Sequence, residues 1–231
     1  MTKMKLSLSV LLSFFLFKLS YAQDWANLNR FKKENAELAT TPSKDDRIVF
    51  MGNSITESWL QIRPQFFSDK PYVNRGISGQ TTPQMLVRFR QDVINLSPSA
   101  VVILAGINDI AGNTGPSTIE MIAANIFSMA ELAQANNIKV ILCSVLPAYD
   151  FPWIKGKEPA DKVIQLNKLI KGYAKKQKIV YVDYHSAMAN KSKGLKEDLG
   201  SDGVHPNEAG YAIMEPLLEH VLAKILNQKI K

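Results

Sequence analysis

The chain has 231 residues, of which 46% are hydrophobic and 21% are charged, the composition of an ordinary globular protein of one domain. This composition excludes a disordered chain and a fibre, and the single cysteine excludes a small fold held together by intrachain disulfides. The formal net charge is only +7 and the lysines are scattered, which argues against nucleic acid as a partner.

The first 22 residues have the pattern of a signal peptide. Two lysines form a basic start, residues 6–19 are mostly apolar, and Ser-Tyr-Ala then provides a cleavage site. A membrane anchor is the competing interpretation, but Lys18 interrupts the apolar run, which is shorter than the ~20 residues that a spanning helix needs. The sequence therefore predicts an exported protein, periplasmic or secreted, that begins at Gln23 and keeps no stable membrane anchor.

Beyond the predicted signal peptide, residues 23–46 are expected to form a leading helix and a polar connector, and residues 47–231 a single further domain. The helix is predicted over Asp24 to Leu38, because apolar residues recur there and would pack across the domain. These apolar residues are Trp25, Leu28 and Phe31.

Five short apolar runs rich in branched residues recur after the connector, each followed by a helical pattern. The strands are predicted at residues 47–51, 72–75, 100–105, 139–145 and 179–183. This alternation predicts a single-domain, three-layer α/β/α sandwich with a five-stranded parallel sheet, a flavodoxin-like arrangement. Such sheets carry their sites beyond the carboxyl ends of the strands, so residues at those ends are the first functional candidates.

Three helix boundaries can also be predicted. Thr82 precedes a proline and is expected to begin a helix, because the missing N–H of proline is not needed in the first turn. Ser117 and Glu120 have the spacing of a capping box at the start of the next helix. In the last helix, Pro216 is expected to cause a kink or a delayed start.

A serine lies directly past the first predicted strand, in residues 51–56, which read Met-Gly-Asn-Ser-Ile-Thr. Ser54 therefore lies in the turn that leads into a helix, where an exposed nucleophile would be placed. The alternative role of an isolated serine at this position is to cap the helix that follows. This block alone leaves both roles open.

The second and third predicted strands end in residues that suit an oxyanion hole. The glycines after the second strand permit a close backbone approach, and the Gly79 N–H could point to the same place as Ser54. Asn108 follows the third strand, where its amide could donate to a developing oxyanion. A plain strand-to-helix turn and an Asx turn are the alternative interpretations.

A carboxylate and an imidazole lie three residues apart in the glycine-containing loop before the last helix. This spacing lets Asp202 orient His205 and balance its charge. An Asp-Gly turn followed by a helix-capping histidine is the alternative. The other two histidines are assigned lesser roles, His220 as a surface residue and His185 as a structural residue after the fifth strand, with a place in the lining of the site as the alternative for His185.

Together these four blocks resemble those of the SGNH/GDSL hydrolases, which are named for Ser, Gly, Asn and His. They occur in the right order at strand ends, and the resemblance extends over residues 47–226. It implies the SGNH hydrolase fold and acyl-ester hydrolysis without a metal or an organic cofactor. It also implies these roles: Ser54 as nucleophile, His205 as base with Asp202 as its orienting partner, and Gly79 N–H, Asn108 side chain and Ser54 N–H as oxyanion-hole donors.

The first block departs from the family pattern. Where Gly-Asp-Ser-Leu is usual, this chain has Gly52, Asn53, Ser54 and Ile55. Asn53 keeps the shape and most of the hydrogen-bonding capacity of an aspartate without its charge. We therefore expect activity to survive the departure.

The acyl group and the alcohol are predicted less directly. The Gly-Gln-Thr-Thr turn at residues 79–82 resembles the platelet-activating-factor acetylhydrolase-like branch, which implies short acyl groups. After the fourth strand, Tyr149, Phe151 and Trp153 are expected to stack on a sugar ring or to cover an acyl chain, and a lid packed on the core is the alternative.

The prediction is thus an exported serine esterase that removes acetyl groups, with a small-molecule or carbohydrate ester as its partner. A lysophospholipase or lipid acyl-esterase of the same fold is the first alternative. A non-catalytic exported binding module is the second, and it comes from a different functional class. The sequence leaves the oligomeric state open.

Overall fold

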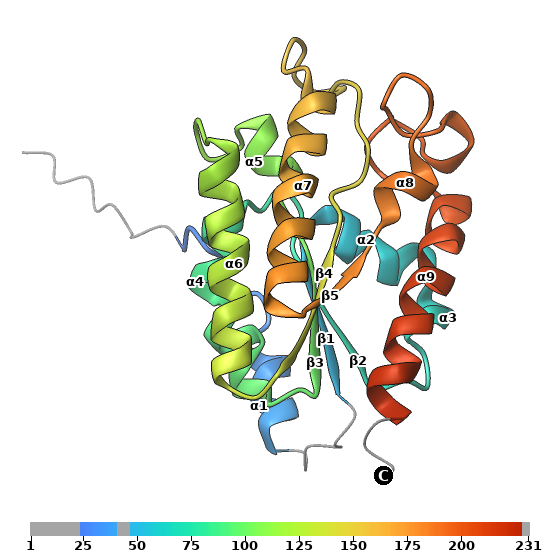
Figure 1. Ribbon diagram of the computed structural model, residues 1–231. Coiled ribbons are helices and arrows are strands. Elements are labelled where there is room, and N and C mark those ends of the chain that lie inside the picture. Colours follow the sequence, from blue (N-terminus) through green and yellow to red (C-terminus); the bar gives the residue numbers. More distant parts are fainter. Residues whose placement is uncertain (1–23, 41–46, 228–231) are drawn as a thin grey trace, which may run out of the picture.

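The computed structural model describes residues 24–40 and 47–227 (Figure 1). The predicted signal peptide, residues 1–22, and nearly all of the predicted polar connector lie outside these ranges. In the part of the chain that is described, none of the helices combines the length and the apolar character needed to cross a membrane.

The centre of the protein is a five-stranded parallel sheet with the order β2-β1-β3-β4-β5. The strands are β1 (Ile48–Gly52), β2 (Tyr72–Gly76), β3 (Ala100–Leu104), β4 (Lys139–Cys143) and β5 (Val180–Val182). β1 and β3 are buried along their whole length, as expected of central parallel strands that are covered on both faces. The strand order is the flavodoxin-like one, and it confirms the predicted fold.

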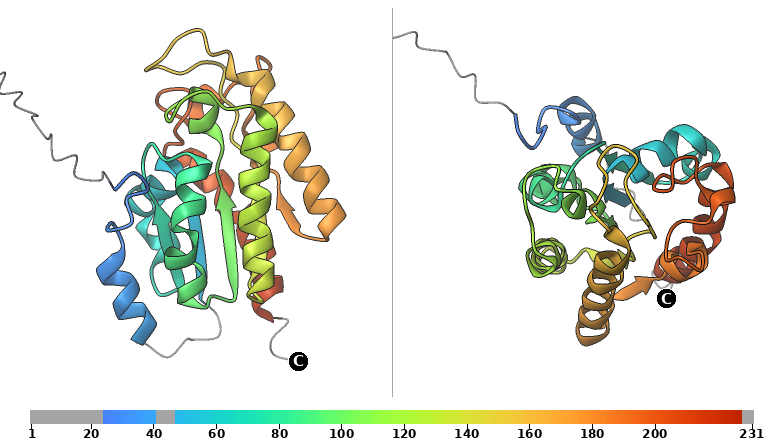
Figure 2. Two further views of the ribbon diagram at one scale, coloured as in Figure 1. Left: turned by 90° about the vertical axis from the view of Figure 1, so that its left-hand side faces the viewer. Right: turned by 90° about the horizontal axis from the view of Figure 1, so that it is seen from above.

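Helices cover both faces of the sheet (Figures 1 and 2). On one face lie α4 (Thr82–Asp92), α6 (Ile119–Ala135) and α7 (Pro159–Gln177), and on the other lie α2 (Ser54–Ile62), α3 (Pro64–Phe67), α8 (Tyr184–Met188) and α9 (Glu208–Asn227). The described fold also contains the N-terminal helix α1 (Lys32–Thr40) and three short elements, α5 (Ile107–Ala111), η1 (Ile94–Leu96) and η2 (Glu197–Leu199). Three layers result, as predicted.

An aromatic cluster fixes α9 against α2, the two helices that flank the predicted catalytic loops. The buried Trp59 ring of α2 stacks on Phe66 at 4.8 Å and on Tyr211 of α9 at 5.4 Å, measured between ring centroids. The hydroxyl of Tyr211 donates to the Ile55 carbonyl at 2.7 Å. These contacts hold residues that are far apart in the chain at one edge of the sheet.

The predicted helix over Asp24 to Leu38 is wrong in its first part. The carboxylate of Asp24 accepts hydrogen bonds from the N–H groups of Leu28 and Asn29, and Asn27 has a left-handed φ of 56°. Together these features close a turn, so α1 begins only at Lys32 and runs to Thr40.

Two further boundary predictions need correction. Thr118 caps α6 by accepting from the Met121 N–H, so Ser117 is not the cap. α9 begins at Glu208 and continues through Pro216, which therefore does not delay it. Because Pro216 and Ala212, four residues earlier, are both exposed, water can satisfy the carbonyl that the proline leaves unpaired. The predicted start of α4 at Thr82 is confirmed.

Candidate active site

Ser54 is the first residue of α2, immediately beyond the carboxyl end of β1. The side chain that caps α2 belongs to Asn53, whose Oδ1 accepts the Ile55 N–H at 3.0 Å. The Ser54 hydroxyl is thereby free for another partner, and its Oγ lies 2.9 Å from Nε2 of His205. The unusual Asn53 thus acts as a neutral helix cap, and Ser54 does not have the capping role.

Asp202 accepts three hydrogen bonds, two of which come from His205 and orient it. Oδ2 of Asp202 lies 2.7 Å from Nδ1 of His205, and Oδ1 accepts the N–H groups of His205 and Val204 at 2.8 and 2.9 Å. Gly203 has a φ of +80°, which favours glycine and lets the loop turn back on the carboxylate. Partial burial alone would raise the pKa of Asp202, but these hydrogen bonds outweigh it and hold the pKa below its usual value. Asp202 is therefore an anion at neutral pH.

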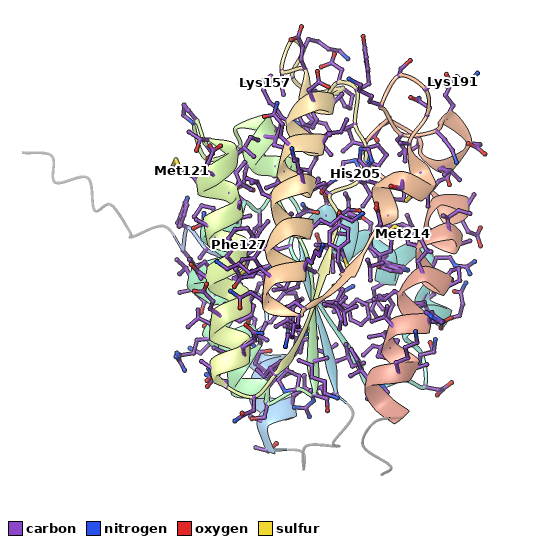
Figure 3. All side chains as sticks on the ribbon, in the orientation of Figure 1. Met121, Phe127, Lys157, Lys191, His205 and Met214 are labelled. Atoms are coloured by element: carbon purple, nitrogen blue, oxygen red, sulfur yellow. The ribbon has the colours of Figure 1, made fainter. Side chains whose placement is uncertain are left out.

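Ser54, Asp202 and His205 line a cavity of about 520 Å³. His205 lies beyond the carboxyl ends of the strands (Figure 3). Gly79 and Asn108 line the same cavity, so the structure brings all five predicted catalytic and oxyanion-hole residues together. The rest of its lining is Ser58, Ser78, Asn113, Trp153 and Ser201.

The loop of Gly79 and the side chain of Asn108 are held by hydrogen bonds behind the cavity. Nδ2 of Asn108 donates one hydrogen to the Gln80 carbonyl at 3.0 Å, and the amide has a second hydrogen for a ligand. The Gly79 carbonyl accepts from Nδ2 of Asn113 at 3.0 Å, and the φ of Gly79 is +76°. The two predicted oxyanion donors are thus fixed by partners of their own.

A buried arginine supports this loop, and no pattern in the sequence indicates this role. Arg88 is fully buried in α4, where it pairs with Asp92 at 2.9 Å and donates to the side chain of Gln80. It also donates to the carbonyls of Gly52 and Arg75 at the ends of β1 and β2. Burial lowers the pKa of Arg88, and the hydrogen bond to Asp92 opposes this effect. From the sequence, an arginine and an aspartate four residues apart suggest an exposed pair.

Asp109 is a second buried charge behind the site, next to Asn108. Its carboxylate accepts hydrogen bonds from the N–H and the hydroxyl of Thr82, the first residue of α4. Burial raises its pKa to about 6, although the hydrogen bonds from Thr82 act in the opposite direction. Between pH 4 and 6 the folded protein therefore binds more protons at this position than the unfolded chain does.

This shift predicts a pH-dependent effect of Asp109→Asn on stability. The contribution of Asp109 to the free energy of unfolding should fall by up to about 3 kcal/mol as pH rises from about 4 to 6. Above pH 6 this contribution should stay constant. A neutral asparagine lacks this ionisation. Urea unfolding should therefore show that the free energy of unfolding of the wild type, relative to the variant, is larger at pH 4 than at pH 7. A difference independent of pH would contradict the shift.

The three aromatic side chains that follow β4 lie in three different environments. Trp153 lines the catalytic cavity, and its ring centroid lies 5.8 Å from that of His205. Phe151 is fully buried and stacks against Trp153 at 5.2 Å, so it supports that ring and cannot meet a substrate. Tyr149 lines a different cavity, of about 580 Å³, which contains none of the residues Ser54, Asp202 and His205. The predicted contact of Phe151 with substrate is therefore wrong.

The remaining histidines lie outside the catalytic cavity. His220 is exposed on α9, as predicted. His185 is half-buried in α8, and its backbone N–H donates to Oγ of Ser144. Burial lowers the pKa of the His185 ring. Among the described residues, its ring atom Nε2 has no hydrogen-bond partner.

A doubly wound α/β sheet with a Ser-His-Asp chain of hydrogen bonds at its strand ends is the arrangement of a serine hydrolase of the SGNH type. The model of the GDSL-like lipase/acylhydrolase family matches residues 50–213. The chain belongs to this family, and it is a carboxylic ester hydrolase.

Individual relatives agree with this assignment. The solved structure of a GDSL-like lipase from Bacteroides thetaiotaomicron is 51% identical, with a TM-score of 0.82 over 86% of this chain and 98% of that one. Esterase TesA of Pseudomonas aeruginosa is 25% identical over 177 residues, 74% of this chain and 79% of the relative. Acetylxylan esterase of Geobacillus stearothermophilus is 28% identical over 148 residues, 62% of this chain and 67% of the relative.

Proposed function

We propose that this esterase is an exported serine hydrolase that removes short acyl groups, acetyl above all, from carbohydrate. The observation that carries the mechanism is the continuous hydrogen-bond chain from Ser54 through His205 to Asp202, with distances of 2.9 and 2.7 Å. Its order is that of nucleophile, general base and orienting carboxylate. The proposed export rests on residues 1–22, and amino-terminal sequencing of the native protein would test whether it begins at Gln23.

The first half of the reaction forms an acyl-enzyme. Nε2 of His205 accepts the Ser54 proton while Oγ attacks the ester carbonyl. The negative charge that develops on the carbonyl oxygen is stabilised by the N–H groups of Ser54 and Gly79 and by Nδ2 of Asn108. His205 then gives its proton to the departing alcohol, and Asp202 stabilises the imidazolium without taking its proton.

The second half repeats these steps with water. His205 accepts a proton from water, the hydroxide attacks the acyl carbon, and the same three donors hold the oxyanion. Breaking the bond to Oγ releases the carboxylic acid, and His205 returns the proton to Ser54. No residue beyond those around the cavity is required for a complete cycle.

The lining of the catalytic cavity favours a short acyl group on a polar alcohol. A channel for a long chain needs apolar walls, since each buried methylene adds about 0.8 kcal/mol to binding. Beside the catalytic groups this cavity presents mainly hydroxyls and amides, with Trp153 as its one aromatic side chain. A half-exposed tryptophan ring among hydroxyls suits a sugar ring, and one relative is named an acetylxylan esterase.

The proposal predicts a preference for acetyl esters. With p-nitrophenyl acetate, octanoate and palmitate, kcat/KM should be at least about tenfold higher for acetate, because the longer chains find no apolar wall. The purified protein should also release acetate from acetylated xylo-oligosaccharides, and it should release little fatty acid from lysophospholipid. A higher kcat/KM for octanoate or palmitate would favour a lipid esterase instead.

A further inference from the structure

A second cavity, of about 430 Å³, adjoins the catalytic one. The two cavities share Ser78, Gly79 and Asn113, so the second cavity lies next to the one that contains Ser54. The far wall of the second cavity includes Trp25. Trp25 precedes residues 50–213, the region that the family model matches.

The backbone of Trp25 and of Ala26 is hydrogen-bonded to the loop and helix that form the oxyanion side of the site. The Trp25 carbonyl accepts from Nε2 of Gln84 in the first turn of α4 at 2.6 Å. The carbonyl of the buried Ala26 accepts from Nε2 of Gln80 at 2.8 Å. Figure 2 shows this blue segment beside the start of α4. Trp25 is therefore held in place through its backbone, without use of its side chain.

The indole of Trp25 itself is left half uncovered. It is 49% exposed, whereas Ala26 and Phe31 in the same segment are buried against the domain. The side chains that share the cavity with it are mainly neutral amides and hydroxyls, such as Asn27, Gln84 and Thr114. The nearby carboxylate of Asp24 is already occupied by the N–H groups that it accepts.

A flat apolar ring beside neutral donors and acceptors matches the chemistry of a sugar ring. The aliphatic C–H face of a pyranose can cover the indole while its hydroxyls bond to amides and hydroxyls. A fatty acyl chain would need continuous apolar walls, which this cavity lacks. A polyanionic ligand would need clustered cations, and this cavity presents none among its lining residues.

We propose that Trp25 and the first turn of α4 form a binding subsite for a neutral sugar residue next to the acylated one in the catalytic cavity. The inference rests on the proposed carbohydrate esterase function and extends it. An acetylated oligosaccharide would lie across the loop of Gly79, with its acetyl group at Ser54 and its neighbouring residue on Trp25.

The test compares Trp25→Ala and Trp25→Phe with the wild type on three substrates, namely p-nitrophenyl acetate, an acetylated xylose monosaccharide and acetylated xylotetraose. For Trp25→Ala, kcat/KM on the tetraose should fall about tenfold through KM, as expected for losing an uncovered ring face of this size. Activity on the two small substrates should not change, and Trp25→Phe should recover most of the loss. Met121→Ala is the control, since this exposed residue of α6 lies away from His205 and should leave all three rates unchanged (Figure 3).

A binding measurement separates the subsite from catalysis. Calorimetry with xylotetraose on the Ser54→Ala protein should show a Kd about tenfold weaker when Trp25→Ala is added. An equal loss on all three substrates would show that Trp25 supports the oxyanion loop, and no loss on the tetraose would show that it does not bind sugar. Either result overturns the subsite while leaving the esterase proposal intact. A wild type that cleaves p-nitrophenyl acetate but not the acetylated sugars would overturn the carbohydrate proposal and the subsite with it.

Discussion

Replacement of Ser54 by alanine is expected to lower kcat for ester hydrolysis by about 10⁴- to 10⁶-fold, and His205→Ala by a similar factor. The Ser54 hydroxyl is nucleophilic only while Nε2 of His205 can take its proton, and the 2.9 Å distance shows the pair ready for this transfer. Because each residue is useless without the other, the double variant should lose little more than either single variant. Initial rates with p-nitrophenyl acetate would measure all three.

Ser58→Ala is the matched control for this experiment. Ser58 lines the same cavity one helical turn further along α2, but it is not part of the chain that ends at Asp202. Its removal should change kcat by no more than a few fold, and thermal unfolding should show that all variants are folded. A fluorophosphonate probe should label the wild type and the Ser58→Ala variant but not Ser54→Ala. Labelling of Ser54→Ala, or turnover near the wild-type value, would place the nucleophile elsewhere.

The sheet could be predicted from the sequence because its information is local. Each central strand is a continuous apolar run, as in β1 and β3, since both of its faces are buried. The N-terminal helix was misplaced for a reason that is equally physical. Apolar residues recur at helical spacing from Trp25, but the capping carboxylate of Asp24 and the left-handed Asn27 close a turn first. The spacing of apolar residues alone does not show whether the chain forms a helix or this turn.

Some residues of the candidate site could likewise be predicted from the sequence, and others could not. Asp202 and His205 could be paired from the sequence because they are three residues apart, and the order of blocks linked them to Ser54. The role of Arg88 could not be predicted, because it depends on carbonyls at the ends of two strands that are distant in the chain. The burial of Phe151 beneath Trp153 depends likewise on how the loop after β4 folds over the core. Residues that act through long-range packing leave no local pattern.

Hydrogen bonds behind the cavity connect the predicted oxyanion-hole residues to the rest of the domain. Gln80 accepts from Asn108 through its carbonyl and from Arg88 through its side chain, and it donates to Ala26. One residue thus connects the N-terminal segment, a buried ion pair and a predicted oxyanion donor. Preorganisation of this kind is what makes a hydrogen-bond donor effective, because no reorganisation is needed as charge develops.

Asn108→Ala should therefore lower kcat by about 10²- to 10³-fold with little change in KM, the usual loss for one oxyanion-hole donor. The effect falls on kcat because the amide meets the substrate oxygen fully only when that oxygen is negatively charged. Asn108 also holds the Gln80 carbonyl, so a general loosening of the loop is the competing explanation. Loosening would raise KM and lower the unfolding temperature together with the rate.

Asn125→Ala separates these explanations. Asn125 is a partly buried asparagine, whose Nδ2 donates to the Thr82 hydroxyl at 3.0 Å, and it is not part of the catalytic cavity. Its loss should affect stability while leaving kcat within about a few fold of the wild type. If the two variants lose stability equally, and only Asn108→Ala loses turnover, the loss belongs to the missing donor. If Asn108→Ala keeps the wild-type kcat, the developing charge is held by the N–H groups of Ser54 and Gly79 alone, and Asn108 serves only to anchor the loop of Gln80.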